Sequence, residues 1–104
     1  MKEYNVIPSG AAKRDMLELR RYIAKVLHEP GSAARIYASV KAAMLSLHQN
    51  PLRCPVLREE PYATLGVRWL PAENYIIFFL VHEQKKEVRV LRVAYNRRDL
   101  QNVL

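Results

Sequence analysis

The stretch YIIFFLVHEQKKEVRVLRVAY, residues 75–95, decides the fold. Residues 75–81 form an almost continuous apolar run, which is typical of a strand covered on both faces or nearly so. Residues 83–86, EQKK, form a polar turn, and residues 88–95 follow as a second strand rich in valine. Because strands joined by so short a connection pair antiparallel, the sequence predicts a hairpin here.

Two further strands are expected on either side of a helical region. Residues 66–70, GVRWL, begin a strand, and residues 71–74, PAEN, turn it into the hairpin, so the last three strands should form an antiparallel meander. Residues 2–8 are typical of a short strand closed by Pro8. We expect this first strand to join an edge of the sheet.

Two amphipathic helices are predicted between the first strand and the meander. Ser9 is a good N-cap for the first helix, which ends at residues 28–29 because the position before Pro30 disfavours helical backbone. Ser32 is the N-cap expected for the second helix, which stops at residues 50–51. A break this short indicates an antiparallel helical hairpin. The apolar stripes are Ala12, Met16, Leu19, Ile23, Val26 and Leu27 in the first helix and Ile36, Val40, Ala43, Met44 and Leu47 in the second.

The element order is therefore β-α-α-β-β-β. This order predicts an α+β fold in which the helical hairpin packs on one face of a mainly antiparallel sheet, within a single domain over residues 1–104. Residues 51–65 contain three prolines and no apolar period, which predicts a long surface connection.

The charge balance favours an anionic partner. Seventeen Lys and Arg against ten Asp and Glu give a formal net charge of +7, which attracts nucleic acid or an acidic protein segment. A surface that is only solvated explains the same charge.

The sequence has no run of about 18 apolar residues to cross a membrane and no apolar stretch of a signal peptide near residue 1. Cys54 is the single cysteine, so we expect a cytoplasmic protein in which Cys54 is a small, partly buried hydrophobe.

Basic residues gather near the end of the chain. Six lie between Lys85 and Arg98, against the single acid Glu87. Alternation along the last strand places Arg89, Leu91, Val93 and Tyr95 on one face and Val90, Arg92 and Ala94 on the other. Arg68 joins either Arg89 or Arg92, depending on the register of the strands. Several arginines and a tyrosine on a sheet suit phosphate. Arginine stems lying over the rim, with their heads in water or paired to Glu, are the simpler alternative.

No metal and no cofactor are expected. His28, His48 and His82 lack the spacing of metal ligands. The three glycines are isolated, so they form no phosphate loop.

The order of segments, together with LHQNP at residues 47–51, NYIIFFLV at residues 74–81 and VRVLRVAYNRRD at residues 88–99, resembles the RelE/ParE superfamily along essentially the whole chain. The Tyr-Asn-Arg-Arg-Asp run is the most specific part. The resemblance implies the same β-α-α-β-β-β fold. It also implies a toxin that is held inactive by an acidic antitoxin from the same operon, and that acts when free either on the ribosome, by cutting mRNA, or on DNA gyrase, by binding.

The residues favour the ParE-like mode of action, gyrase inhibition, over the RelE-like one. A nuclease needs a base, an acid and cations around the phosphate, and Tyr95 is the only proton-transfer group near the arginines. Ile76 stands where RelE-like nucleases often carry an Arg. If the protein is a nuclease, Tyr95 and Arg98 are the expected catalytic residues. An inactive, toxin-like binding module is a third hypothesis. The residues expected to bind nucleic acid or the target are Arg68, Arg89, Arg92, Arg97 and Arg98.

Overall fold

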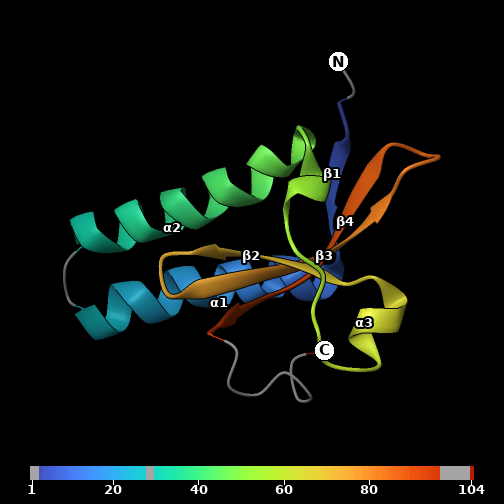
Figure 1. Ribbon diagram of the computed structural model, residues 1–104. Coiled ribbons are helices and arrows are strands. Elements are labelled where there is room, and N and C mark those ends of the chain that lie inside the picture. The colour runs from blue at the N-terminus through green and yellow to red at the C-terminus, as the bar shows by residue number, and fades with distance from the viewer. Residues whose placement is uncertain (1–2, 28–29, 97–103) are drawn as a thin grey trace.

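A computed structural model of the chain describes residues 3–27, 30–96 and 104. In these residues the elements follow one another in the predicted order, with one short helix added before the second strand (Figure 1). Two 3₁₀ turns, Ser46–His48 and Pro51–Arg53, continue the second helix into the connection that follows it. The helices and strands are β1 (Asn5–Pro8), α1 (Gly10–Leu27), α2 (Pro30–Leu45), α3 (Tyr62–Leu65), β2 (Arg68–Ala72), β3 (Tyr75–His82) and β4 (Glu87–Tyr95).

The four strands form one sheet in the order β1-β4-β3-β2. β2 and β4 both pair antiparallel with β3, which confirms the meander. β1 lies at the edge beside β4 and runs parallel to it, with Asn5 opposite Glu87 and Pro8 opposite Val90. The sheet is therefore mixed but mainly antiparallel, and the first strand does join an edge.

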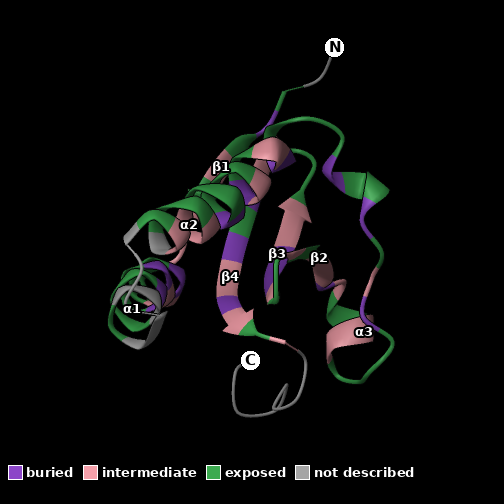
Figure 2. Ribbon diagram, turned by 90° about the vertical axis from the view of Figure 1, so that its left-hand side faces the viewer, coloured by how far each residue is buried: buried purple, intermediate pink, exposed green. Residues whose placement is uncertain are grey.

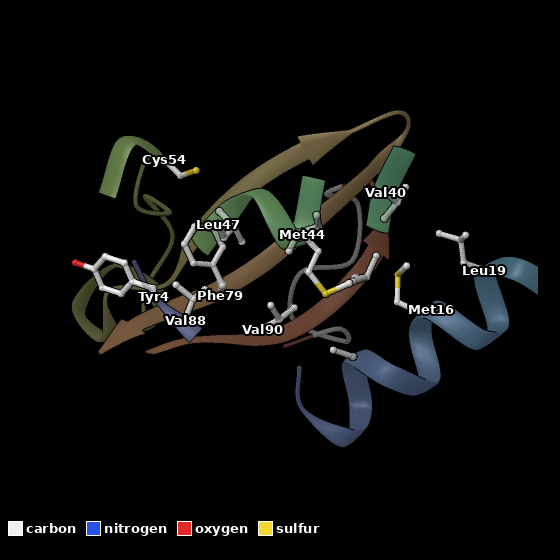
Figure 3. Packing of buried hydrophobic residues seen from close by; sticks show 13 residues of the cluster. Tyr4, Met16, Leu19, Val40, Met44, Leu47, Cys54, Phe79, Val88 and Val90 are labelled. Carbon is white, nitrogen blue, oxygen red and sulfur yellow. The ribbon is translucent and has the colours of Figure 1, made fainter. Parts of the chain in front are cut away.

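The two long helices cover one face of the sheet, as predicted (Figures 1 and 2). They run antiparallel, and the described part of their predicted stripes, which includes Met16 and Leu19 of α1 and Val40, Met44 and Leu47 of α2, packs with β3 and β4 in one cluster (Figure 3). The α2 helix begins at Pro30 rather than after Ser32, so the predicted N-cap is wrong; proline favours the first helical turn, where its missing N–H is not needed. The buried residues of this cluster are Tyr4, Ala12, Met16, Leu19, Val40, Met44, Leu47, Cys54, Ile77, Phe79, Val88, Val90 and Val93.

The other face of the sheet is covered by the connection between α2 and β2. This segment is more ordered than the surface loop predicted for residues 51–65, because it contributes Leu57 to a second buried cluster with Val67, Ile76 and Phe78. It also forms α3, which ends where Gly66 adopts a left-handed backbone at φ 79°. Burial on both faces explains the unbroken apolar run of β3.

A β-bulge in β4 interrupts the predicted alternation of its side chains. Phe79 pairs with Val90, but Phe78 pairs with Arg92, so Leu91 is an extra residue. As a result, Val93 joins Val90 in the cluster beneath the helices, while Leu91 and Ala94 pack in the cluster on the opposite face. The predicted grouping of Leu91 with Val93 on one face was therefore wrong.

Candidate functional site

The β1 strand pairs with β4 only as far as Val90, and beyond this point the α1 helix lies along the same edge of β4. Ser9 fixes the junction between β1 and α1, because its N–H donates to the Val90 carbonyl at 2.9 Å and its hydroxyl donates to the Leu91 carbonyl at 2.8 Å. The same hydroxyl oxygen accepts the Ala12 N–H at 3.0 Å, so Ser9 is the N-cap of α1, as predicted. The far half of β4 consequently lies beside a helix instead of a strand.

Asp15 of α1, six residues beyond Ser9, continues the contact between the helix and β4. Its carboxylate accepts the Val93 N–H at 2.9 Å and binds Arg92 in a bidentate manner, from Nε at 2.7 Å and from Nη2 at 2.9 Å. The hydrogen bond to Asp15 raises the pKa of the Arg92 guanidinium, which stays protonated. Only 10% of the Asp15 side chain and 32% of the Arg92 side chain are exposed. The Asp15 carboxylate thus neutralises Arg92 and also accepts the Val93 N–H, a backbone donor that points away from β3.

A groove of about 380 Å³ opens between α1 and the end of the sheet. Tyr75 and Tyr95 form one wall, with their ring centroids 5.4 Å apart in an edge-to-face arrangement. Burial raises the pKa of the Tyr75 hydroxyl, and the neighbouring Tyr22 and Tyr95 contribute in the same direction. The residues that line the groove are Asp15, Glu18, Leu19, Tyr22, Tyr75, Val93 and Tyr95.

The structure does not bring the predicted cations Arg68, Arg89 and Arg92 together. Arg68 pairs with Phe79 on β3, and its Nη1 donates to the Cys54 carbonyl at 2.6 Å. The side chain therefore holds the connection between α2 and β2, and the prediction that it joins Arg89 or Arg92 was wrong. Its strand, β2, is separated from β4 by β3.

The other residues predicted to bind the target or to act in catalysis do not lie together in one site. Arg89 forms an exposed ion pair with Glu87 at 3.0 Å, and Arg92 is bound to Asp15. Tyr95 lies in the groove with 59% of its surface exposed. Arg97 and Arg98 lie outside the residues that the structure describes.

Sequence reasoning missed the residues that α1 contributes to the groove. Asp15, Glu18 and Tyr22 are spaced by three and four, which places them on one side of the helix, next to the apolar stripe. This spacing was visible in the sequence. What the sequence could not give was the edge of β4 beside which α1 lies.

The described part of the chain offers neither a metal site nor a membrane-spanning helix. Residues 3–27, 30–96 and 104 contain no group of three or more His, Cys, Asp and Glu side chains that could hold a metal ion. Within those same ranges, no helix combines the length and the hydrophobicity needed to span a bilayer.

A helical hairpin on one face of a four-stranded, mainly antiparallel sheet is the fold of RelE/ParE-type toxins. The family comparison narrows this class, because residues 6–100 match the model described as "ParE toxin of type II toxin-antitoxin system, parDE". The chain belongs to this family and is a toxin of a type II toxin–antitoxin system.

Solved structures agree with this assignment at the level of the fold. A chain of the chromosomal ParDE toxin–antitoxin system from P. aeruginosa is similar with a TM-score of 0.73 and 21% identity, covering 93% of this chain and 100% of that one. A chain of the RelBE2 toxin–antitoxin complex from Mycobacterium tuberculosis is similar with a TM-score of 0.63 and 25% identity, covering 90% and 99% respectively. Among curated proteins, no sequence matches this chain.

Proposed function

We propose that this ParE-family toxin arrests growth by binding DNA gyrase when it is free of its antitoxin, and that it does not cut RNA. The observation that carries the proposal is the setting of Tyr95, the candidate proton-transfer group of a nuclease. Tyr95 shares its groove with two carboxylates, Asp15 and Glu18.

Cleavage of RNA by 2′-OH attack requires cations that converge on the phosphate. Among the described residues, the guanidinium of Arg92 is bound to Asp15, while Arg68 and Arg89 are held at other places on the sheet. Because Arg92 neutralises Asp15, a phosphate in the groove would meet the carboxylate of Glu18 and no described cation among the lining residues, which disfavours its binding. Inhibition of gyrase by binding does not require cations around a phosphate in this groove.

The proposed partner in the resting cell is an acidic antitoxin from the same operon, in the cytoplasm. A net charge of +7 favours association with an acidic chain. Both similar structures belong to toxin–antitoxin systems. The large apolar side chains of Leu17 and Tyr22 on α1 and Leu45 on α2 are at least half exposed, which suits a partner that covers the helical hairpin.

Ribosome-dependent mRNA cleavage is the second candidate. It is favoured by the likeness to the RelBE2 chain and by the exposure of Tyr95, whose side chain is accessible to a substrate. The third candidate, an inactive module, predicts that the protein leaves growth unaffected.

A growth assay with Tyr95→Phe tests the proposal. For a gyrase-binding toxin, growth inhibition should persist, because the ring remains and only the hydroxyl is removed. For a nuclease, loss of the general acid–base should lower cleavage by about a hundredfold or more. The matched variant Arg97→Ala with Arg98→Ala should weaken toxicity in both cases. Full toxicity of this double variant at equal soluble expression would exclude the two arginines from target binding, and loss of toxicity in Tyr95→Phe would contradict the proposal.

A further inference from the structure

We infer that the groove between α1 and β4 binds an arginine or lysine side chain presented by an extended segment of the antitoxin, an inference that rests on the proposed antitoxin partnership. The groove combines three tyrosine rings with a carboxylate on a protein that is otherwise basic. An acidic antitoxin would therefore carry one cationic anchor among its acidic residues.

Three tyrosine rings line the groove. Tyr75 and Tyr95 meet edge to face, and Tyr22 stands opposite on α1 with 60% of its surface exposed. Aromatic faces attract a cation within about 6 Å of the ring centroid, and the attraction grows when the cation leaves water. The chain already contains such contacts, since Arg20 lies 5.7 Å from the ring centroid of Tyr37 and Lys86 lies 5.0 Å from that of Tyr4.

The carboxylates of Asp15 and Glu18 make a cationic side chain the better fit for the groove. Asp15 is already bound by the Arg92 guanidinium and the Val93 N–H. Glu18, one turn further along α1, also lines the groove; its charge helps to raise the pKa of the Arg92 guanidinium, but within the described ranges the two do not form an ion pair. A cation that lies against the tyrosine rings therefore has Glu18 as its counter-charge, whereas an anionic side chain would be repelled.

The backbone of β4 explains why an extended segment fits. The Val93 N–H faces Asp15 rather than β3, and the Asn96 N–H donates to the Asn74 carbonyl at 3.0 Å on the β3 side. Because N–H groups alternate in direction along an antiparallel strand, the Tyr95 N–H points away from β3, to the same side as that of Val93. Because α1 and Asp15 occupy this edge of β4 as far as Val93, an extended segment would meet β4 at its end, beside the Tyr95 N–H and the groove. Such a segment directs every second side chain toward one face, so one of them can enter the groove.

Nuclear magnetic resonance titration of the free toxin with the probe acetyl-Val-Arg-Val-amide tests this inference. Its neutral analogue, with citrulline in place of arginine, has nearly the same shape and removes the charge. We expect saturable shifts of the Tyr22, Tyr75 and Tyr95 ring signals with the arginine peptide, and binding at least about threefold weaker for citrulline, given the usual strength of cation–π contacts. Equal binding of the two peptides, or shifts that do not saturate, would overturn the inference.

Two variants connect the peptide result to the groove. Glu18→Gln and Tyr22→Ser alter exposed residues of α1 and should each weaken binding of the arginine peptide by roughly threefold or more. Glu83→Gln is the matched control, because it removes the same charge from an exposed turn away from the groove. An equal loss in Glu83→Gln would indicate general electrostatic attraction and contradict a specific site.

Binding of the operon's antitoxin separates this inference from the proposed function. If the antitoxin binds the natural toxin and Glu18→Gln with the same Kd, the inference is wrong while the antitoxin partnership stands. If the antitoxin does not bind the natural toxin at all, the proposed partnership fails, and with it the assignment of the groove to an antitoxin side chain. A Kd at least about threefold higher for Glu18→Gln, with no change for Glu83→Gln, supports the inference.

Discussion

At the scale of single residues, Asp15 has the most consequential role outside the apolar core. Its carboxylate binds the Arg92 guanidinium in a bidentate manner and accepts the Val93 N–H, which points away from β3. By contrast, the ion pair of Arg89 with Glu87 is exposed, so water screens it. Partly buried and exposed ion pairs on the same strand should therefore differ in their effect on stability.

Asp15→Ala is expected to lower the free energy of unfolding by roughly 2–4 kcal/mol, because it removes the bidentate partner of the partly buried Arg92 guanidinium and the acceptor of the Val93 N–H. Urea unfolding, followed by circular dichroism, measures the change. Glu87→Ala is the control and should cost no more than about 1 kcal/mol. Similar losses of unfolding free energy in both variants would mean that the Asp15 contact stabilises the fold no more than an exposed ion pair does.

Cys54 should react slowly with thiol reagents in the native protein. Only 4% of its surface is exposed, and burial raises the pKa of the thiol, although Arg53 and Arg68 act in the opposite direction. A raised pKa means less of the reactive thiolate at neutral pH, so labelling should accelerate sharply when urea unfolds the chain. Labelling of the native protein at the rate of the unfolded chain would show that the thiol is open to solvent.

At the scale of elements, the sequence predicted what local patterns determine. The stripes of α1 and α2, the apolar run of β3 and the meander all follow from periodicity and short connections. The faces of β4 did not follow, because the extra residue Leu91 is a bulge that depends on how β4 pairs with β3. Arg68 was misplaced for a similar reason, since its partner is a carbonyl of the preceding connection, which no local pattern shows.

Ser9→Ala tests the junction between β1 and α1. The substitution removes the cap of α1 and the hydroxyl's bond to the Leu91 carbonyl, so we expect a loss of about 1–2 kcal/mol in unfolding free energy. Ser39→Ala, at an exposed position within α2, is the control and should be neutral or slightly stabilising, because alanine favours helix. Thermal unfolding of both variants measures the difference. Equal stability of Ser9→Ala and the natural protein would exclude a role for the hydroxyl.

At the scale of the whole molecule, one thin sheet separates two different surfaces. The helical hairpin covers one face and carries exposed apolar side chains, while α3 and its connection cover the other (Figure 2). The groove with Tyr95 lies where α1 meets the end of the sheet. Arg68, Arg89 and Arg92 are each held at a different place on the sheet, and the described residues that line the groove include no Lys or Arg. This arrangement is the basis for proposing a toxin that acts by binding its target.

The measurement that tests this account most directly uses purified toxin, free of antitoxin, in two parallel reactions. One contains DNA gyrase with supercoiled plasmid, and the other contains translating ribosomes with mRNA. We predict gyrase-dependent DNA breaks or loss of supercoiling, which added antitoxin should reverse, and intact mRNA. Ribosome-dependent mRNA cleavage with unaffected gyrase would contradict the account.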